Sequence, residues 1–145
     1  MKKMMIAAMM LLLSTASFAG KSDVLKAILK AKTYTEAEQL LTQGINQLAD
    51  NSEKAAAYNY LTQLALKAAQ ADQATGKESA EAYEAVANAF SNAQECVKYD
   101  QLPDAKGKVK PKYASLADQL YIMRGQLING GVFFQNAKDD AKAYK

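Results

Sequence analysis

The chain has 145 residues, a formal net charge of +3, no histidine, no tryptophan and one cysteine. The missing histidine excludes Ser-His and Cys-His catalytic pairs and histidine-ligated metal sites within this chain, and the lone cysteine excludes an internal disulfide. The nearly balanced charge also argues against a nucleic-acid binder, which needs a pronounced basic patch.

The first twenty residues have the three parts of a secretory signal peptide. Lys2 and Lys3 precede the apolar run 4–13, and a small-residue cleavage site follows and ends at Ala19. A membrane anchor is the alternative, but a spanning helix needs about 20 apolar residues and this run has half of that. We therefore predict a signal peptide at 1–19, cleaved after Ala19, and a periplasmic or secreted domain at 20–145 with no membrane span.

The remaining chain is rich in Ala, Leu, Lys, Gln and Glu and lacks runs of β-branched residues, which predicts an all-α domain. The first helix is expected at 22–32 with Ser22 or Asp23 as its cap. A second is expected at 35–49, where Thr33 and Glu36 have capping-box spacing. Its apolar positions recur at helical intervals: Ala37, Leu40, Leu41, Gly44, Ile45 and Leu48.

Two longer helices are expected at 52–74 and 78–98, followed by an irregular loop at 99–112 that contains Pro103, Gly107 and Pro111. A fifth helix is expected at 113–134 and a sixth from 139. Short connections force successive helices to lie antiparallel, so the pattern predicts helical hairpins at about 22–49, 52–98 and 113–145. A compact bundle and a solenoid of stacked hairpins both satisfy this pattern.

Residues 127–145, LINGGVFFQNAKDDAKAYK, set a small residue at Gly130, an aromatic at Phe133 and an alanine at Ala143. This spacing resembles the tetratricopeptide repeat, whose helices cross closely at small residues. Lys138 stands where that family usually has glycine. The segment KTYTEAEQLL is similar to the second half of another such repeat, and Gly130 is expected at a close helix contact that valine would disrupt.

With the signal peptide, these segments resemble the N-terminal part of secreted or periplasmic tetratricopeptide-repeat proteins of gram-negative bacteria. The resemblance implies a TPR-like solenoid of antiparallel helical hairpins that binds a protein or peptide, with no catalytic residue, no cofactor and no metal. Such a repeat needs its terminal hairpin covered, and Phe133, Phe134 and Ala143 would lack a neighbour. We therefore expect the protein to continue beyond Lys145.

Tyrosines are the strongest candidates for partner contact, because a tyrosine can bury its ring and keep its hydroxyl at the surface. Tyr58 with Gln63, and Tyr121 with Arg124, lie on the first helix of their pairs, which lines the concave face of repeat proteins. Ordinary packing between helices is the favoured alternative for these tyrosines.

The remaining polar features favour structural roles. The loop contains four lysines at alternate positions: Lys106, Lys108, Lys110 and Lys112. They suit either an acidic partner or an anionic membrane surface, but a solvated connector is the favoured interpretation of the loop. Cys96 is expected as a buried small hydrophobe rather than a nucleophile. Four carboxylates are candidates for an acid/base pair: Glu78, Glu81, Glu84 and Asp118. The favoured interpretation places them on solvated helix faces, with Lys77 and Glu81 as an ordinary surface ion pair.

The sequence thus predicts an exported, non-enzymatic helical scaffold for protein–protein interaction. Two alternatives stay open: a periplasmic chaperone or adhesin-type helical protein, and the non-catalytic N-terminal part of a larger enzyme.

Overall fold

The structure is a computed structural model that describes residues 21–73 and 78–144, and every regular element in these two ranges is helical. The predicted signal peptide and Lys77 lie outside the described residues. The elements in chain order are α2 (Asp23–Ile28), α3 (Tyr34–Gly44), the 3-10 helix η2 (Ile45–Gln47), α4 (Asn51–Gln73), α5 (Ala80–Asp100), α6 (Leu116–Asn136) and α7 (Asp140–Ala143). The all-α prediction is confirmed.

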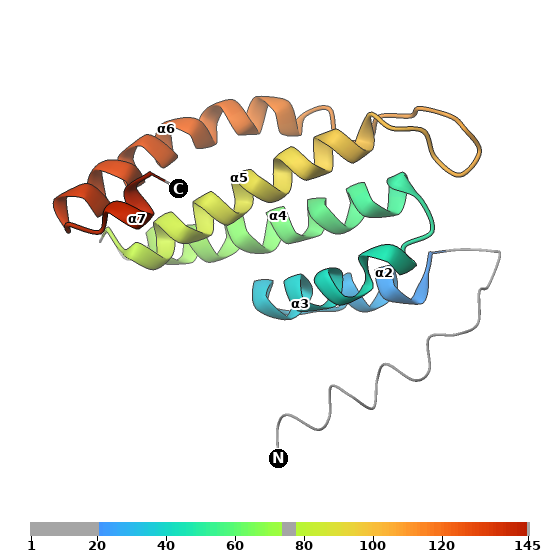
Figure 1. Cartoon of the computed structure of the whole chain (residues 1–145), viewed down its shortest axis with the longest axis horizontal. Coiled ribbons are helices and arrows are strands. Elements are labelled where there is room, and N and C mark those ends of the chain that lie inside the picture. The colour runs from blue at the N-terminus through green and yellow to red at the C-terminus, as the bar shows by residue number, and fades with distance from the viewer. Residues whose placement is uncertain (1–20, 74–77, 145) are drawn as a thin grey trace, which may run out of the picture.

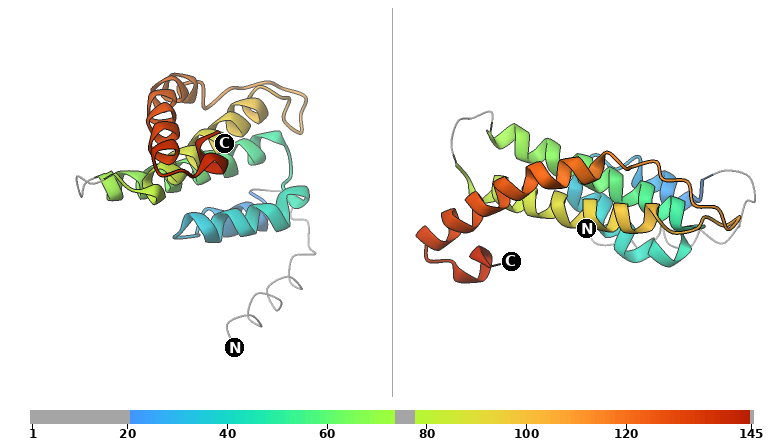
Figure 2. Two further views of the ribbon diagram at one scale, coloured as in Figure 1. Left: turned by 60° about the vertical axis from the view of Figure 1, so that its left-hand side comes forward. Right: turned by 90° about the horizontal axis from the view of Figure 1, so that it is seen from above.

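The helices are stacked in the order of the chain (Figure 1). The long helices α4 and α5 form an antiparallel pair in the centre, with α2 and α3 against α4 and with α6 on the other side, against α5. Helix α7 folds back onto α6, as the turned views also show (Figure 2). The central pair is therefore covered on both sides, whereas α6 forms an outer layer.

Side-chain caps begin four of the helices. Asp50 caps α4 by accepting the Glu53 N–H at 3.0 Å, and the other three caps are hydroxyl groups. The hydroxyl of Ser22 accepts a hydrogen bond from the Leu25 N–H at 3.2 Å, and that of Thr33 accepts one from the Glu36 N–H at 3.3 Å. The Glu36 carboxylate accepts a hydrogen bond from the Lys32 N–H. In a regular capping box the donor would be the N–H of the cap residue Thr33, so the returning hydrogen bond is shifted by one residue. Ser79 caps α5 in the same way.

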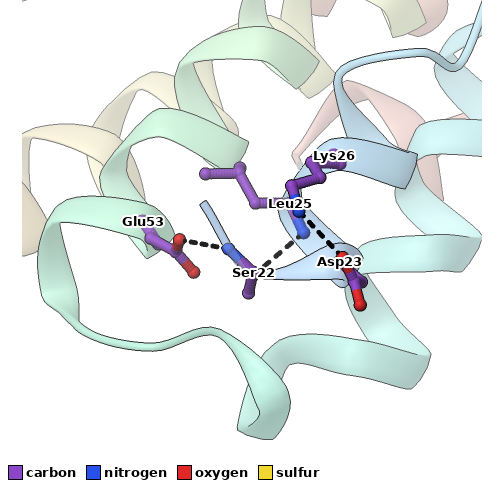
Figure 3. A network of polar contacts seen from close by, with 5 residues as sticks. All are labelled: Ser22, Asp23, Leu25, Lys26 and Glu53. Carbon is purple, nitrogen blue, oxygen red and sulfur yellow. Dashed lines mark hydrogen bonds and ion pairs between the residues drawn. The ribbon is translucent and has the colours of Figure 1, made fainter. Parts of the chain in front are cut away.

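Glu53 ties the start of α2 to the start of α4 (Figure 3). One carboxylate oxygen accepts the Ser22 N–H at 2.7 Å, and the other accepts the Ala49 N–H at 2.8 Å. Close by, Lys26 and Asp23 form an ion pair on the outer surface of α2. The first hairpin is thus attached to α4 by polar contacts as well as by its apolar face.

The core contains large side chains near the N-terminus and small ones in the centre. The cluster between α2, α3 and α4 is built from aliphatic residues: Val24, Leu25, Ile28, Leu41, Leu48 and Leu61, with Ala31, Ala37 and Ala57. Between α4, α5 and α6 the buried residues are mostly alanines, together with Met123, Cys96 and Leu116. Alanine contacts let two helix backbones approach closely, which explains the tight α4–α5 pair.

Several predicted boundaries are wrong by a few residues. Helix α2 ends at Ile28 rather than at 32, because tighter hydrogen bonds of the 3-10 type close its last turn. Helix α3 ends at Gly44, and η2 replaces its expected last turn. Helix α5 continues to Asp100, and α6 begins at Leu116 rather than at 113, so the loop spans 101–115.

The two adjacent glycines of α6 contact different helices. A Cβ at Gly130 would lie 3.0 Å from Cδ1 of Tyr83, on α5, whereas one at Gly131 would lie 3.1 Å from the Ala143 carbonyl, on α7. The expected close contact therefore exists at Gly130, but its partner is the preceding helix. Gly131 is the residue at the crossing within the last hairpin.

The end of the chain is better packed than expected. Phe134 is buried, its ring lies 6.4 Å from the Tyr83 ring, and the Lys142 ammonium lies over the Phe134 ring at 5.5 Å from its centroid. The Phe133 ring lies 5.2 Å from the same Tyr83 ring, so the expectation that Phe133 and Phe134 lack a neighbour is wrong. Lys138 has a φ of 59°, the left-handed conformation that glycine favours.

Candidate functional site

Three of the candidate catalytic residues, Cys96, Glu78 and Glu84, are buried or held by a partner, whereas Glu81 and Asp118 are exposed. Cys96 is fully buried, and desolvation raises the pKa of its thiol from 9.0 to about 12, so it is a poor nucleophile. Glu84 forms an ion pair with Lys142, and Glu78 accepts a hydrogen bond from the Tyr83 hydroxyl. In the described part of the chain, no three His, Cys, Asp or Glu side chains gather in a way that would hold a metal ion.

Helix α6 carries apolar residues on two opposite faces. One face packs against α5 and contains Leu116, Met123, Gly130 and Phe134. The other face is open to solvent: Tyr121 is 79% exposed, Ile128 62% and Val132 52%, and Ile122 beside them is 69% exposed. We call Tyr121, Ile122, Gly125, Ile128 and Val132 the outer face of α6.

The spacing of the outer face is regular. Tyr121, Gly125, Ile128 and Val132 follow one another at intervals of four, three and four residues, which at about 100° per residue places them within roughly 60° of the helix circumference. Single exposed apolar residues are normal on a protein surface. Here four of the seven large exposed hydrophobic residues of the described chain lie on this one helix, so they form a patch.

Gly125 lies in the middle of the outer face and is not required by packing within the chain. A Cβ added there would meet no atom within 4 Å. A glycine inside a helix costs roughly 1 kcal/mol of stability relative to alanine. The helix therefore carries a destabilising residue where its own fold gives no reason for one, and this residue leaves the backbone open to close approach.

The outer face ends in a depression with polar walls. This depression has a volume of about 530 Å³ and lies between the C-terminal half of α6 and Glu78, two residues before α5. Its lining combines amide, carboxylate and apolar groups: Glu78, Asn129, Val132, Phe133, Asn136 and Ala137. It offers hydrogen-bonding groups at the edge of an apolar surface, as protein interfaces do.

The structure separates the two pairs of predicted contact residues. Tyr121 belongs to the outer face and Arg124 is exposed at its edge. Tyr58 is half-buried on α4, where its ring stacks on Tyr99 at 5.7 Å with 7° between the planes, and Gln63 is exposed on the same helix. Tyr58 is thus engaged in packing within the chain, whereas Tyr121 is exposed to solvent on α6.

The prediction missed Ile122, Gly125, Ile128 and Val132. Their signal was present as a second apolar stripe on the predicted fifth helix, opposite the stripe through Leu116 and Met123. Two stripes on one helix do not reveal which of them is buried.

Comparison with family models, with characterised proteins and with solved structures finds no match to this chain. The relation to tetratricopeptide repeats therefore stays a prediction. In the described part of the chain, no helix is both long enough and apolar enough to cross a membrane.

Proposed function

We propose that this chain is an exported helical scaffold that binds another protein through the outer face of α6. The observation that carries the proposal is the exposed stripe formed by Tyr121, Ile128 and Val132 around Gly125. A contiguous apolar patch of this kind is the usual mark of an interaction site on a soluble protein. The scaffold has no catalytic role in this proposal.

The partner element is an amphipathic helix. Intervals of four, three and four residues are those of the seam between two packed helices, where each apolar side chain inserts between residues of the facing helix. Gly125 allows the two backbones to come close at the centre of this seam. Arg124 and Asn129 lie beside the stripe and supply polar groups for the rim of the contact.

The stacking order supports the same choice. Helix α5 covers α4, and α6 covers α5, each through an apolar stripe. A partner helix on the outer face would continue this stack by one layer, in the manner of a helical repeat that binds its partner as an additional helix. The predicted TPR-like solenoid is part of this proposal.

Site-specific photo-crosslinking tests the proposal. A photoreactive phenylalanine analogue replaces Ile128 in one variant and the exposed residue Lys67 of α4 in the control, and both are irradiated in cells. We expect one adduct of discrete mass from the Ile128 variant and none from the control. The crosslinked peptide of the partner, identified by mass spectrometry, should have helical apolar spacing.

Other results would overturn the proposal in different ways. No adduct from the Ile128 variant, or the same adduct from both variants, would remove α6 as the interaction surface. A broad range of adducts would favour a chaperone for unfolded clients, and an adduct of two copies of this chain would show self-association instead.

A further inference from the structure

The loop 101–115 between α5 and α6 extends beyond the ends of the helices (Figure 1). Four exposed lysines lie in it: Lys106, Lys108, Lys110 and Lys112. Two apolar side chains are exposed among them, Leu102 at 42% and Val109 at 51%. The loop therefore combines positive charge with apolar tips, and it does not belong to the outer face of α6.

The base of this loop is held by side chains of the helix ends. The buried Asp100 carboxylate accepts the Lys112 N–H at 2.9 Å and the Tyr113 N–H at 2.8 Å. From the start of α4, the Asn51 side chain donates to the Pro103 carbonyl at 2.8 Å. These contacts give the loop a defined position, which a merely solvated connector does not require.

The tip of the loop is a closed turn. The Asp104 N–H donates to the Lys108 carbonyl and the Gly107 N–H donates to the Asp104 carbonyl, both at 2.9 Å. The Asp104 carboxylate accepts the N–H groups of Lys106 and Lys108, and hydrogen bonding by the Lys108 N–H is the main cause that lowers its pKa. Gly107 has a φ of 71°, which favours glycine at this position.

The acidic groups near the loop are used to hold its backbone, while the ammonium groups remain available. Asp100 and Asp104 accept loop N–H groups as described, and Asp50 accepts the Ala105 N–H at 3.1 Å. Within residues 21–73 and 78–144, none of the four loop lysines forms an ion pair. The four exposed lysines are thus carried by a backbone that side chains hold in place.

We infer that the loop 101–115 is a contact site for an anionic lipid surface, with Lys106, Lys108, Lys110 and Lys112 facing phosphate-bearing headgroups. Clustered lysines are attracted to anionic bilayers without needing a shaped site for each phosphate. The exposed Leu102 and Val109 suit the boundary between headgroups and acyl chains, where basic segments bury apolar residues.

A nucleic acid fits this loop less well than a lipid surface does. Stacking of bases needs open aromatic faces, and the aromatic residues nearest the loop in sequence are occupied: Tyr99 stacks on Tyr58, and Tyr113 is half-buried against Cys96 and Leu116. Apolar tips such as Val109 have no role on a phosphate backbone.

Vesicle co-sedimentation tests the inference. The full chain is mixed with vesicles of phosphatidylglycerol and phosphatidylcholine, or with vesicles of phosphatidylcholine alone. One variant changes Lys106, Lys108, Lys110 and Lys112 to glutamine. The control variant makes the same change at four exposed lysines elsewhere, which equalises the net charge: Lys30, Lys32, Lys67 and Lys138. Residues 1–20 are identical in all proteins, so their contribution to binding is shared.

We expect much tighter binding to the anionic vesicles than to vesicles of phosphatidylcholine alone. Each loop lysine should contribute roughly fivefold to the partition coefficient, so the loop variant should lose roughly several hundredfold while the control stays within about twofold. Circular dichroism should show the same melting temperature for both variants, because all the replaced side chains are exposed. Equal loss in both variants, equal binding to both vesicle types, or tighter binding to single-stranded RNA than to anionic vesicles would overturn the inference.

Discussion

The contact between Gly130 and Tyr83 makes a sharp prediction about the packing of α6 on α5. A Cβ at Gly130 would lie 3.0, 3.2 and 3.3 Å from three carbons of Tyr83, closer than side chains normally pack. The Tyr83 ring has little freedom to move, because it lies 5.2 Å from the Phe133 ring and its hydroxyl donates to Glu78. Gly130→Val adds two further methyl groups at this contact.

The expected cost follows from two opposing effects. Valine is the better helix former by a few tenths of a kcal/mol, whereas forcing extra carbons into a packed contact costs about 1–3 kcal/mol. We therefore expect Gly130→Val to destabilise the chain by about 2 kcal/mol, which corresponds to a melting temperature lowered by roughly 8 °C for a domain of this size.

Gly125 provides the matched control, because it lies on the same helix but faces open space. Gly125→Val should leave the stability unchanged or raise it by a few tenths of a kcal/mol. Urea unfolding followed by circular dichroism measures both variants. If the two variants have equal stability, the close packing of α6 on α5 is refuted, and so is the role assigned to Gly130.

Three further outcomes are expected. Gly44→Ala should destabilise the chain by about 1–3 kcal/mol, because the new Cβ would lie 2.5 Å from Cγ1 of Val24. Adding Val24→Ala should recover part of this loss, whereas independent effects of the two changes would contradict the contact. Asp100→Ala should cost about 2 kcal/mol and speed amide exchange in the loop; unchanged exchange would contradict the anchoring. Because the pKa of Cys96 is raised in the folded chain, the unfolded thiol loses its proton first as the pH rises. The free energy of unfolding should therefore be unaffected by this group below pH 9 and should fall by up to about 1.4 kcal/mol per pH unit towards pH 12. Cys96→Ala should flatten this slope in urea titrations, and an unchanged slope would refute the assignment.

The sequence predicted the helices well where local patterns decide them. The stripe from Ala37 to Gly44 and the caps at Ser22 and Thr33 follow from residue spacing and from short hydrogen bonds within one turn. In the same way, Leu116 and Met123, seven residues apart, lie on the buried face of α6.

The errors occur where residues distant in sequence decide the structure. The loop was expected to begin at 99 but begins at 101, and its conformation depends on Asp50 and Asn51, about fifty residues away. The late start of α6 has the same kind of cause, since Asp100 holds the N–H groups of Lys112 and Tyr113 outside the helix. Hydrogen bonds of this type leave no periodic signal in the sequence.

Helices α5 and α6 differ in how much of their apolar surface is covered by neighbouring helices. Helix α5 contacts helices on two sides, with Ala89 and Ala93 in the core and Tyr83 against Gly130 of α6. Helix α6 is apolar on two sides as well, but a neighbour in the described chain covers only one of them.

Gly125 separates the two explanations for this second apolar side. If the outer face has no partner, Gly125→Val changes only helix propensity and affects nothing else. If a partner helix packs there, the same variant leaves the free chain as stable as before, or slightly more stable, yet blocks the approach of the facing backbone and weakens the crosslink from position 128. Opposite signs for stability and binding are the usual result when a residue serves an interaction at the expense of the fold.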